Sequence, residues 1–319
     1  MTNSAILLLV FNRPDTVLQV IDSVRLAEPK RLYVAADGPR EGNLEDQALC
    51  KKTRENVLDN IDWDCEVKTL FRDKNVGLRN GVTGALDWFF KHEESGIILE
   101  DDCVPNSSFY TLCDDLLPRY LEDTRIGMIS GNNYGFDLYD PTLSYSFSKH
   151  GLIWGWATWR RAWKLYDKTN FNLSDKELEL IGENVSKNTN YRNLWMEEAK
   201  YALSGKISVW ASLWGIVRYT NNLLIVRPRV NLVANVGFGD NATHTSGQAD
   251  EKFKVSHQLK IPFVHPAHIL PDYQADATLE NFRLEAFPKT QIKVTKSKFK
   301  KMKTKLHYAY LSLFKGKSN

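Results

Sequence analysis

The stretch Gly96-Ile-Ile-Leu-Glu-Asp-Asp-Cys-Val-Pro105 joins a short apolar run to three consecutive carboxylates. Residues 97–99 predict a buried strand, because three large apolar residues before an acidic cluster leave little room for helical periodicity. Glu100, Asp101 and Asp102 then lie at the carboxyl end of that strand. Open α/β sheets bind ligands at this edge, and crowded carboxylates favour a hard divalent cation among them. A solvated acidic turn is the alternative for this stretch taken alone.

Apolar patterns on both sides of this stretch alternate between strands and helices. Strands are predicted over residues 5–10, 31–36, 66–71, 96–99, 126–130, 223–226 and 230–236. Helices are predicted from Pro14, over 41–58, 81–91 and 107–120, and as a pair within 174–203. This alternation predicts an α/β fold with a Rossmann-like, mainly parallel sheet flanked by helices. With no internal repeat and no linker, residues 1–292 are expected to form one domain.

The composition fits a large globular chain. Its 319 residues are 43% hydrophobic, which is enough for a substantial core. The four Cys lack close metal-ligand spacing and indicate reduced thiols in a cytoplasmic protein. The first apolar run is short and has no basic start, so it predicts a strand rather than a signal peptide. No apolar run approaches the roughly 20 residues that a membrane-spanning helix needs.

Basic residues are concentrated at the C-terminus. Nine Lys and no acidic residue lie from Lys293 onward, which leaves 33 basic and 39 acidic residues before it. Apolar residues recur there at three- and four-residue steps, so residues 293–319 predict a basic amphipathic helix. Such a helix suits an anionic membrane surface, with a helix packed on the domain as the alternative. Nucleic-acid binding is disfavoured, because the rest of the chain is acidic and carries no binding motif.

The ends of the other predicted strands carry residues that suit a single nucleotide ligand. These residues are Phe11, Asn12, Arg13, Asp37, Gly38, Asn75 and Arg79. Asp37 can accept a hydrogen bond from the imide N–H of a base, and Gly38 lets a backbone approach closely. A diphosphate needs a cation and an Arg, which Asp102 together with Arg79 or Arg13 can provide. Their order along the chain favours a nucleotide site over a set of ordinary turns.

Six segments give the chain a specific resemblance to a known family. They are Leu8-Leu-Val-Phe-Asn-Arg-Pro14, Ala36-Asp-Gly38, Asn75-Val-Gly-Leu-Arg79, Ile98-Leu-Glu-Asp-Asp-Cys-Val-Pro105, Gly155-Trp-Ala-Thr-Trp-Arg160, and the region from Arg227-Pro228 to Thr243-His244. The chain resembles GT-A-fold, nucleotide-sugar-dependent glycosyltransferases. It is similar in particular to the N-acetylglucosaminyltransferase I type and to bacterial glycosyltransferases of surface-polysaccharide clusters. The resemblance spans about residues 5–245.

The resemblance implies a metal-dependent transferase whose donor is expected to be a UDP-sugar. It implies that Asp102 binds Mn²⁺ or Mg²⁺, and that Glu100 and Asp101 contact the ribose or the donor sugar. It also implies that Asp37 reads uracil. Two further residues, Arg13 and Arg79, are implied to lie near the nucleotide.

Two more segments take roles from the resemblance. Residues 237–245 resemble a loop that orders over the bound donor, in which His244 contacts the metal or a phosphate; an ordinary surface histidine is the alternative. The aromatic run that contains Trp154, Trp156 and Trp159 is expected to line the acceptor side, because aromatic faces pack on sugar C–H surfaces. Packing of these rings in the core is the alternative.

The expected catalytic base is missing from its position. An inverting transferase needs a base for the acceptor's proton, and relatives carry an Asp where Val209-Trp-Ala-Ser-Leu-Trp214 has Ala211. Three explanations stay open. Ala211 is an introduced Asp→Ala substitution; or Glu197, Glu198 or Asp240 supplies the base; or the protein is retaining or inactive. We favour the first, which predicts weak catalysis with donor binding intact.

The sequence therefore predicts an inverting glycosyltransferase that extends a lipid-linked saccharide in bacterial surface-polysaccharide synthesis. It would act as a peripheral protein at the cytoplasmic face of the plasma membrane. A nucleotidyltransferase is disfavoured, because residues 11–14 lack the glycines of a triphosphate-binding loop. A catalytically inactive nucleotide-sugar-binding protein is the remaining alternative, and Ala211 is its only direct support.

Overall fold

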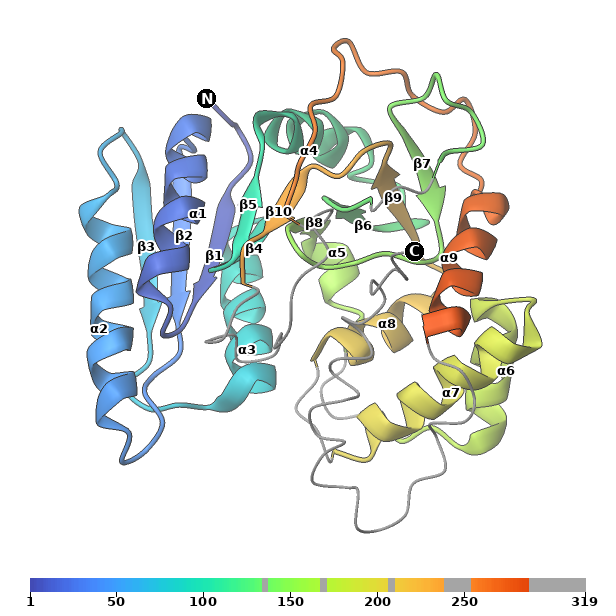
Figure 1. The fold of residues 1–319 in the computed structure, drawn as a ribbon, viewed down its shortest axis with the longest axis horizontal. Helices are drawn as coiled ribbons and strands as arrows, with labels where there is room; N and C mark the ends of the chain where they lie inside the picture. Colours follow the sequence, from blue (N-terminus) through green and yellow to red (C-terminus); the bar gives the residue numbers. More distant parts are fainter. Residues whose placement is uncertain (134–136, 167–170, 206–209, 238–253, 287–319) are drawn as a thin grey trace, which may run out of the picture.

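The computed structural model describes residues 1–133, 137–166, 171–205, 210–237 and 254–286. They form an eight-stranded sheet with helices packed on it, and a second sheet of two short strands (Figure 1). This architecture confirms the predicted α/β fold with a mainly parallel sheet flanked by helices. The predicted basic helix over residues 293–319 lies outside the described residues.

The first hundred residues alternate strictly between strands and helices. Their order is β1 (Ile6–Val10), α1 (Pro14–Ala27), β2 (Arg31–Ala36), α2 (Leu44–Asp59), β3 (Glu66–Phe71), α3 (Gly77–His92) and β4 (Ser95–Glu100). The strands pair in parallel, with β1 between β2 and β4, and with β3 outside β2. Consequently, the carboxyl ends of all four strands meet at one edge of the sheet.

The remaining elements extend the sheet and cover it. Their order is β5 (Cys103–Pro105), α4 (Ser107–Arg119), β6 (Ile126–Ser130), β7 (Tyr145–Ser148), β8 (Trp156–Trp159), α5 (Arg160–Trp163), α6 (Asp175–Val185), α7 (Thr189–Leu203), α8 (Trp210–Thr220), β9 (Leu224–Pro228), β10 (Val233–Asn235) and α9 (Tyr273–Ala286). The order in the large sheet is β3-β2-β1-β4-β8-β6-β9-β7, in which β8 and β7 run antiparallel to their neighbours.

The sheet is buried on both faces. Along β1, Ile6 and Leu8 belong to an apolar cluster shared with α1 and α4, whereas Leu7 and Leu9 belong to a second cluster shared with α3 and α8. All five residues of β1 are buried, because helices cover both faces of the strand. This explains why the strand appears in the sequence as a continuous apolar run.

Besides the four-residue helix α5, the helices α8 and α9 were not predicted from the sequence, each for a physical reason. Helix α8 is apolar nearly all round, and eight of its residues are buried, so it has no amphipathic stripe to detect. Helix α9 buries polar side chains instead, among them Asp276, Glu280 and Arg283. Its inward face therefore does not stand out as hydrophobic.

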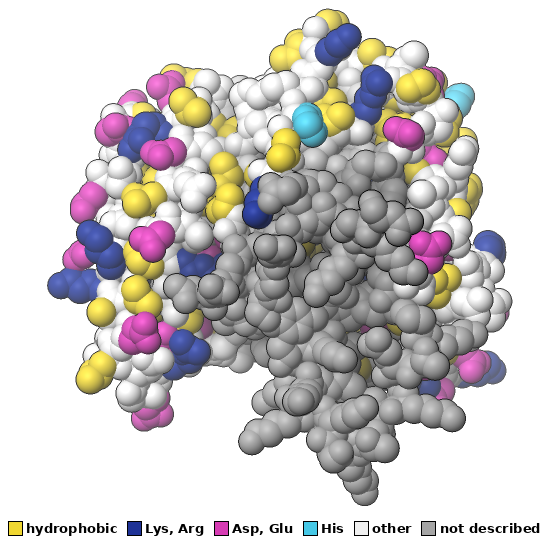
Figure 2. All heavy atoms as spheres, in the orientation of Figure 1, with side chains coloured by type: hydrophobic (Ala, Val, Ile, Leu, Met, Phe, Trp, Pro, Cys, Tyr) yellow, Lys and Arg dark blue, Asp and Glu magenta, His cyan; other side chains and the backbone are white. Residues whose placement is uncertain are grey.

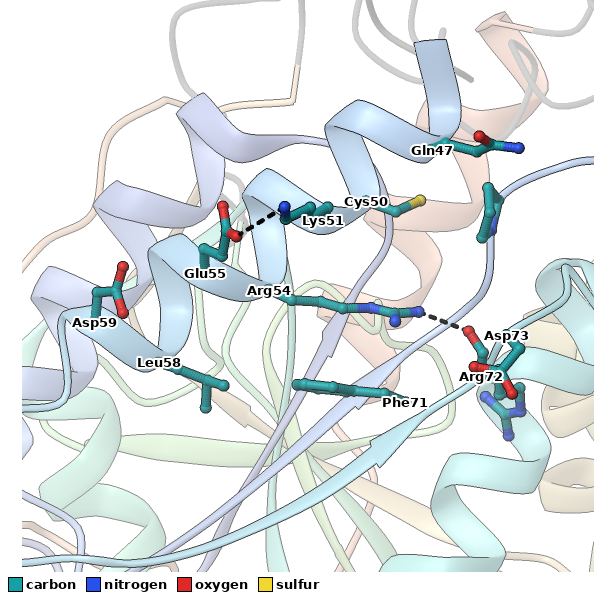
Figure 3. Close-up of a pocket in the computed structure, with 11 residues that line it drawn as sticks. Gln47, Cys50, Lys51, Arg54, Glu55, Leu58, Asp59, Phe71, Arg72 and Asp73 are labelled. Carbon is teal, nitrogen blue, oxygen red and sulfur yellow. Dashed lines mark hydrogen bonds and ion pairs between the residues drawn. The ribbon is translucent and has the colours of Figure 1, made fainter. Parts of the chain in front are cut away.

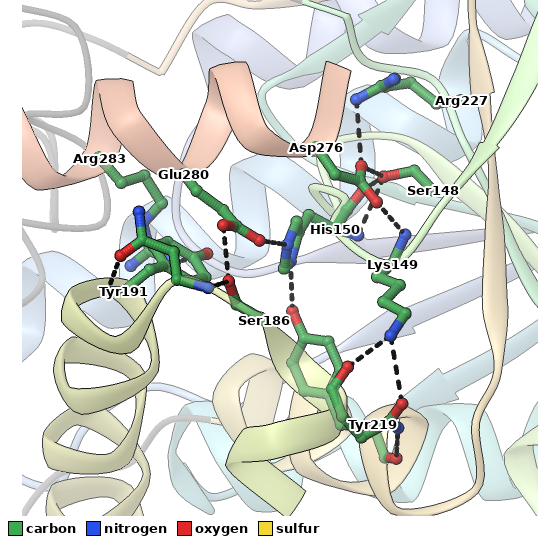
Figure 4. A network of polar contacts seen from close by, with 12 residues as sticks. Ser148, Lys149, His150, Ser186, Tyr191, Tyr219, Arg227, Asp276, Glu280 and Arg283 are labelled. Atoms are coloured by element: carbon green, nitrogen blue, oxygen red, sulfur yellow. Dashed lines mark hydrogen bonds and ion pairs between the residues drawn. The ribbon is translucent and has the colours of Figure 1, made fainter. Parts of the chain in front are cut away.

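A buried polar network holds α9 against the sheet and its neighbours (Figure 4). The His150 ring lies between Glu280, with Nε2 2.9 Å from Oε1, and Tyr219, with Nδ1 2.8 Å from the hydroxyl oxygen. Ser186 donates to the other Glu280 oxygen at 2.6 Å. Each partner comes from a different element or loop, so the network fixes α9 relative to α6 and α8.

In the part of the chain that the structure describes, no helix combines the length and apolar character needed to cross a bilayer.

Replacing Glu280 by Ala tests the importance of this network for stability. We expect Glu280→Ala to lower the free energy of unfolding by about 3 kcal/mol, because the buried His150 and Ser186 lose a partner. Urea denaturation measures the change. Glu285→Ala, an exposed position on the same helix, is the matched control. Equal, small effects of both substitutions would contradict a structural role for the network.

Candidate functional site

The acidic triplet lies beside the end of β1, as the parallel pairing of β1 with β4 requires. Leu9 is paired with Glu100, so the residues that follow each strand emerge together. The Phe11 N–H donates to Asp101 Oδ2 at 3.2 Å. Arg13 Nη1 lies 3.4 Å from Asp101 Oδ1 and 2.5 Å from Asp102 Oδ2. The structure thus brings together these members of the predicted nucleotide site.

One guanidinium does not balance three carboxylates. Burial, followed by repulsion from Asp102 and Asp101, raises the pKa of Glu100 to about 8. Burial also raises the pKa of Asp101 to about 7, although Arg13 opposes the shift. An added cation would favour the ionised forms of these acids.

The donor set fits a hard divalent cation in its chemistry, because it consists of carboxylate oxygens. The Asp102 side chain is 15% exposed, and one of its oxygens pairs with Arg13. His244, the predicted contact of the metal or a phosphate, and Asp240, a candidate base, lie outside the described residues. Within the ranges that the structure describes, no group of three His, Cys, Asp or Glu side chains has the geometry of a metal site.

The strand pair β5–β10 brings a glycine against Asp102. The Val236 N–H donates to the Asp102 carbonyl oxygen at 2.9 Å. A Cβ built on Gly237 would lie 2.1 Å from Asp102 Oδ2, so only glycine fits there without a shift. Gly237 begins the loop that is expected from the resemblance to order over the donor, and the structure adds this close approach to the carboxylate.

Asp37 has a structural role that the sequence analysis missed. Its carboxylate accepts from the Gly38 N–H at 2.9 Å, from the Val76 N–H at 3.1 Å and from the Gly77 N–H at 3.2 Å. These bonds hold the first turn of α3 against the end of β2, and they explain why the helix begins at Gly77, earlier than predicted. Recognition of a base by Asp37 stays a prediction.

Gly38 and Asn75 join the same two loops. A Cβ on Gly38 would lie 2.5 Å from backbone atoms of Lys74, so the close approach predicted at Gly38 is made to the protein's own chain. Asn75 Nδ2 donates to the Gly38 carbonyl at 2.9 Å, and Asn75 Oδ1 accepts from the Gly77 N–H at 3.2 Å. The loop after β3 is therefore fixed before any ligand binds.

The remaining nucleotide-site residues lie in different surroundings. Asn12 Nδ2 donates to Asp46 Oδ1 at 2.8 Å, which ties the end of β1 to α2. Hydrogen bonding from Arg40, opposed by burial, lowers the pKa of Asp46 to about 2. The contact of Asp46 with the end of β1 was not predicted from the sequence, because a position in a polar helix is expected to be exposed to solvent. The Arg79 guanidinium lies 6.0 Å from the centroid of the Phe171 ring.

The predicted acceptor-side tryptophans are buried. Trp156 and Trp159 are 0% exposed and Trp154 is 8% exposed. Trp156 stacks on Trp210, with 5.8 Å between ring centroids, and Trp159 Nε1 donates to the Leu117 carbonyl at 2.8 Å. In the described structure the rings of Trp156 and Trp159 pack in the core, so they offer no free face to a sugar.

Two candidate base positions share one small cavity. Ala211 and Glu198 both line a cavity of about 100 Å³, together with Arg283 and Tyr191. Arg283 Nη2 donates to the two Glu198 oxygens at 2.7 and 2.9 Å. An acid at position 211 would therefore face a cavity that already holds an ion pair.

The cavity lies on the same face of the sheet as Glu100. Ile98 belongs to the apolar cluster shared with α3 and α8, and side chains alternate along a strand, so Glu100 points to that face as well. Trp156 is paired with Ile98 and stacks on Trp210, which directly precedes Ala211. The start of α8 is thus linked through two rings to the strand that carries the acids.

A larger cavity of about 450 Å³ lies between α2 and the end of β3 (Figure 3). Arg54 Nη2 donates to the carbonyl oxygens of Arg72 at 2.7 Å and Asp37 at 3.2 Å, and the Arg54 guanidinium lies over the Phe71 ring. None of the predicted site residues is in its described lining. Acidic and basic side chains are balanced around it, so its chemistry selects no ligand.

Comparisons with known proteins add little to this geometry. No protein-family model matches the chain, and no curated protein matches its sequence. One similar solved structure is UDP-glucose pyrophosphorylase complexed with UDP-glucose, with a TM-score of 0.32 and 6% identity. The match covers 52% of this chain and 82% of that chain. A similarity this small says nothing about what the present chain binds.

The crowded acids should make the free energy of unfolding depend on pH when divalent cations are absent. The folded-state pKa values of Glu100 and Asp101, about 8 and about 7, exceed the ordinary values of 4.5 and 3.8. The folded state therefore binds more protons, and the free energy of unfolding falls as pH rises from about 4.5 to about 8. We expect Glu100→Gln to reduce this fall in urea denaturation across pH.

Glu41→Gln, at an exposed position, is the control and should leave the pH dependence unchanged. The same pH dependence in Glu100→Gln and in the unsubstituted protein would contradict the electrostatic account.

Proposed function

We propose that the protein is a metal-dependent glycosyltransferase that moves a sugar from a nucleotide-sugar, expected to be a UDP-sugar, to a saccharide acceptor. The observation that carries this proposal is the contact of Arg13 with Asp101 and Asp102 where β1 and β4 end. It joins cationic and anionic groups at the sheet edge where α/β proteins bind nucleotides. The sequence resemblance supports the activity, and the geometry supports this edge of the sheet as the site proposed for it.

Some residues of this site hold the loop after β1 in place, and others are proposed to neutralise charge. Asp101 receives the Phe11 N–H and one Arg13 contact, which fixes the loop after β1 against the acids. Asp102 is the ligand proposed for Mn²⁺ or Mg²⁺, and a bound cation there would stabilise negative charge on the leaving diphosphate. With a cation held at Asp102, the Arg13 guanidinium would be placed to donate to a phosphate oxygen.

The acceptor side is proposed to lie at the start of α8. Glu100 points to the face that α8 covers, and Ala211 occupies the position where the resemblance expects a base. An Asp at 211 would take the proton of the attacking hydroxyl. Glu197 and Glu198 are the alternatives among the described residues, and Glu198 is paired with Arg283.

The acceptor class and the location belong to the same proposal. A lipid-linked saccharide in bacterial surface-polysaccharide synthesis, at the inner face of the plasma membrane, is supported by the resemblance. The Lys-rich sequence of residues 293–319 also favours an anionic membrane surface.

Donor binding is tested by thermal shift with UDP, GDP, CMP and their sugar conjugates, each with Mn²⁺ and with EDTA. We expect one nucleotide family to raise the melting temperature by several degrees at saturating concentration, and EDTA to abolish the rise. Asp102→Asn should lose the metal-dependent rise in melting temperature. Asp22→Asn, a substitution at an exposed position on α1, should retain this rise. Absence of any shift would contradict the proposed donor site.

The role of position 211 is tested by Ala211→Asp, with Ala211→Asn as the isosteric control. Release of the nucleotide from the stabilising nucleotide-sugar, with water as acceptor, measures turnover. We expect Asp to raise the rate about 100-fold or more over Asn, because only Asp can act as a base. Equal rates for the two substitutions, with donor binding retained, would favour a binding protein or another base.

A further inference from the structure

An extended segment without helix or strand, residues 254–271, runs along the edge of the molecule before α9 begins; we call it the strap (Figure 1). It is fastened at two places. Near its start, Asn106 Nδ2 donates to the His257 carbonyl at 2.8 Å, and the Leu259 N–H donates to Ser108 Oγ at 2.9 Å. Farther on, Val264 exchanges hydrogen bonds with Ser144, at 2.9 and 3.0 Å.

The strap has an inner and an outer side. Leu259 is buried, and Phe263 and Ile269 pack against the core. Ile261 and Val264 lie between these residues in the chain and are 68% and 47% exposed, and Leu270, which follows Ile269, is 65% exposed. Because the backbone is fastened on both sides of Ile261, these outward side chains are presented by a fixed segment.

Two tyrosines extend the outer side. Tyr273, which begins α9, is 65% exposed, and Tyr139 is 60% exposed. The Tyr139 N–H donates to Asp272 Oδ2 at 3.0 Å, so the two segments that carry these tyrosines lie side by side in space. A ring with a polar tip suits the boundary between water and an apolar phase.

The strap carries no negative charge. Between positions 254 and 271 there are two Lys, Lys254 and Lys260, three His and no Asp or Glu. Arg229 is an exposed basic residue next to the strap. Its backbone N–H donates at 2.9 Å to the carbonyl oxygen of Ser144, the residue that is hydrogen-bonded to Val264.

Among the described residues, the carboxylates of Asp115, Asp140 and Asp272 border the strap, and each has a partner; Asp272 is buried and accepts from the Tyr139 N–H. Asp115 lies 3.4 Å from Arg119 and 3.5 Å from His265. Asp140 accepts from the hydroxyl and N–H of Thr142 at 2.6 and 2.8 Å. Figure 2 shows hydrophobic side chains interspersed with Lys, Arg and His at the top of the molecule, where the strap runs in Figure 1, with Asp or Glu side chains at the upper right.

We propose that the strap is a docking surface for an anionic lipid bilayer, with Ile261, Val264 and Leu270 entering the headgroup region. Large apolar side chains beside cations match the two contributions to interfacial binding, apolar burial and attraction to anionic headgroups. Residues 254–271 themselves contain two Lys and no Asp or Glu, and this charge favours anionic lipid over a partner of mixed charge.

The position of the strap connects this surface with the candidate site. Asn106, which holds His257, directly follows β5, and β5 directly follows Asp102. A bilayer on the strap would therefore lie next to the segment that leaves the acidic triplet. That this serves a lipid-linked acceptor rests on the proposed function; the docking itself does not.

The test uses the full chain and sedimentation with vesicles of phosphatidylcholine, alone or mixed with phosphatidylglycerol. We expect binding to the anionic vesicles and weak binding to the neutral ones. The double substitution Ile261→Ser/Leu270→Ser should lower the partition coefficient about tenfold or more, because two apolar side chains are lost. Lys260→Gln should lower it about fivefold on anionic vesicles only.

The matched control is Leu26→Ser/Leu44→Ser, at positions 85% and 76% exposed at the end of α1 and the start of α2. It should leave the partition coefficient unchanged. Residues 287–319 are present in every variant, so the differences report the strap alone. Absence of vesicle binding, or equal binding by the strap variant and the control, would overturn the proposal.

Two further readouts separate the possible failures. If the strap variant keeps its vesicle binding but turns a dimer into a monomer in analytical ultracentrifugation, the surface binds a second copy of the chain and the lipid proposal is wrong. If vesicle binding depends on the strap while no nucleotide raises the melting temperature, the docking proposal stands and the proposed transferase function fails.

Discussion

The parallel pairing of β1 with β4 is the constraint on which the candidate site depends. It places Arg13 beside Asp101 and Asp102, and it crowds three carboxylates around one guanidinium. Burial and mutual repulsion then raise the pKa values of Glu100 and Asp101, so the folded protein carries an unbalanced acidic cluster at the edge of its sheet. The repulsion within such a cluster is relieved either by protons or by a cation, and a bound cation would give the edge the proposed binding function.

The parts of the fold that depend on apolar periodicity could be predicted from the sequence. The bounds of β2, β3 and β6 were predicted at their observed residues, since each is a short apolar run or alternation between turn residues. The proximity of Arg13 to the acidic triplet could also be predicted from the sequence, because the carboxyl ends of parallel strands lie at one edge of a sheet. Both predictions rest on local patterns and one general rule of sheet topology.

What the sequence could not provide depends on long-range contacts. The Asp37 carboxylate looked free for a base, but it accepts backbone N–H groups from Val76 and Gly77, far away in the chain. Trp156 and Trp159 looked suited to a sugar, but β8 inserts between β4 and β6 and buries both rings. Side-chain type alone does not distinguish an aromatic residue in the core from one at a binding surface.

The central claim is that Asp102 and its neighbours hold a divalent cation together with a nucleotide diphosphate. Electron paramagnetic resonance measures free Mn²⁺ directly and so gives the number of bound ions with and without UDP. The account predicts one tightly bound Mn²⁺ per chain when UDP is present, and loss of that ion in Asp102→Asn. If Mn²⁺ stays free with UDP present, or if Asp102→Asn binds it as well as the unsubstituted protein does, the claim is contradicted.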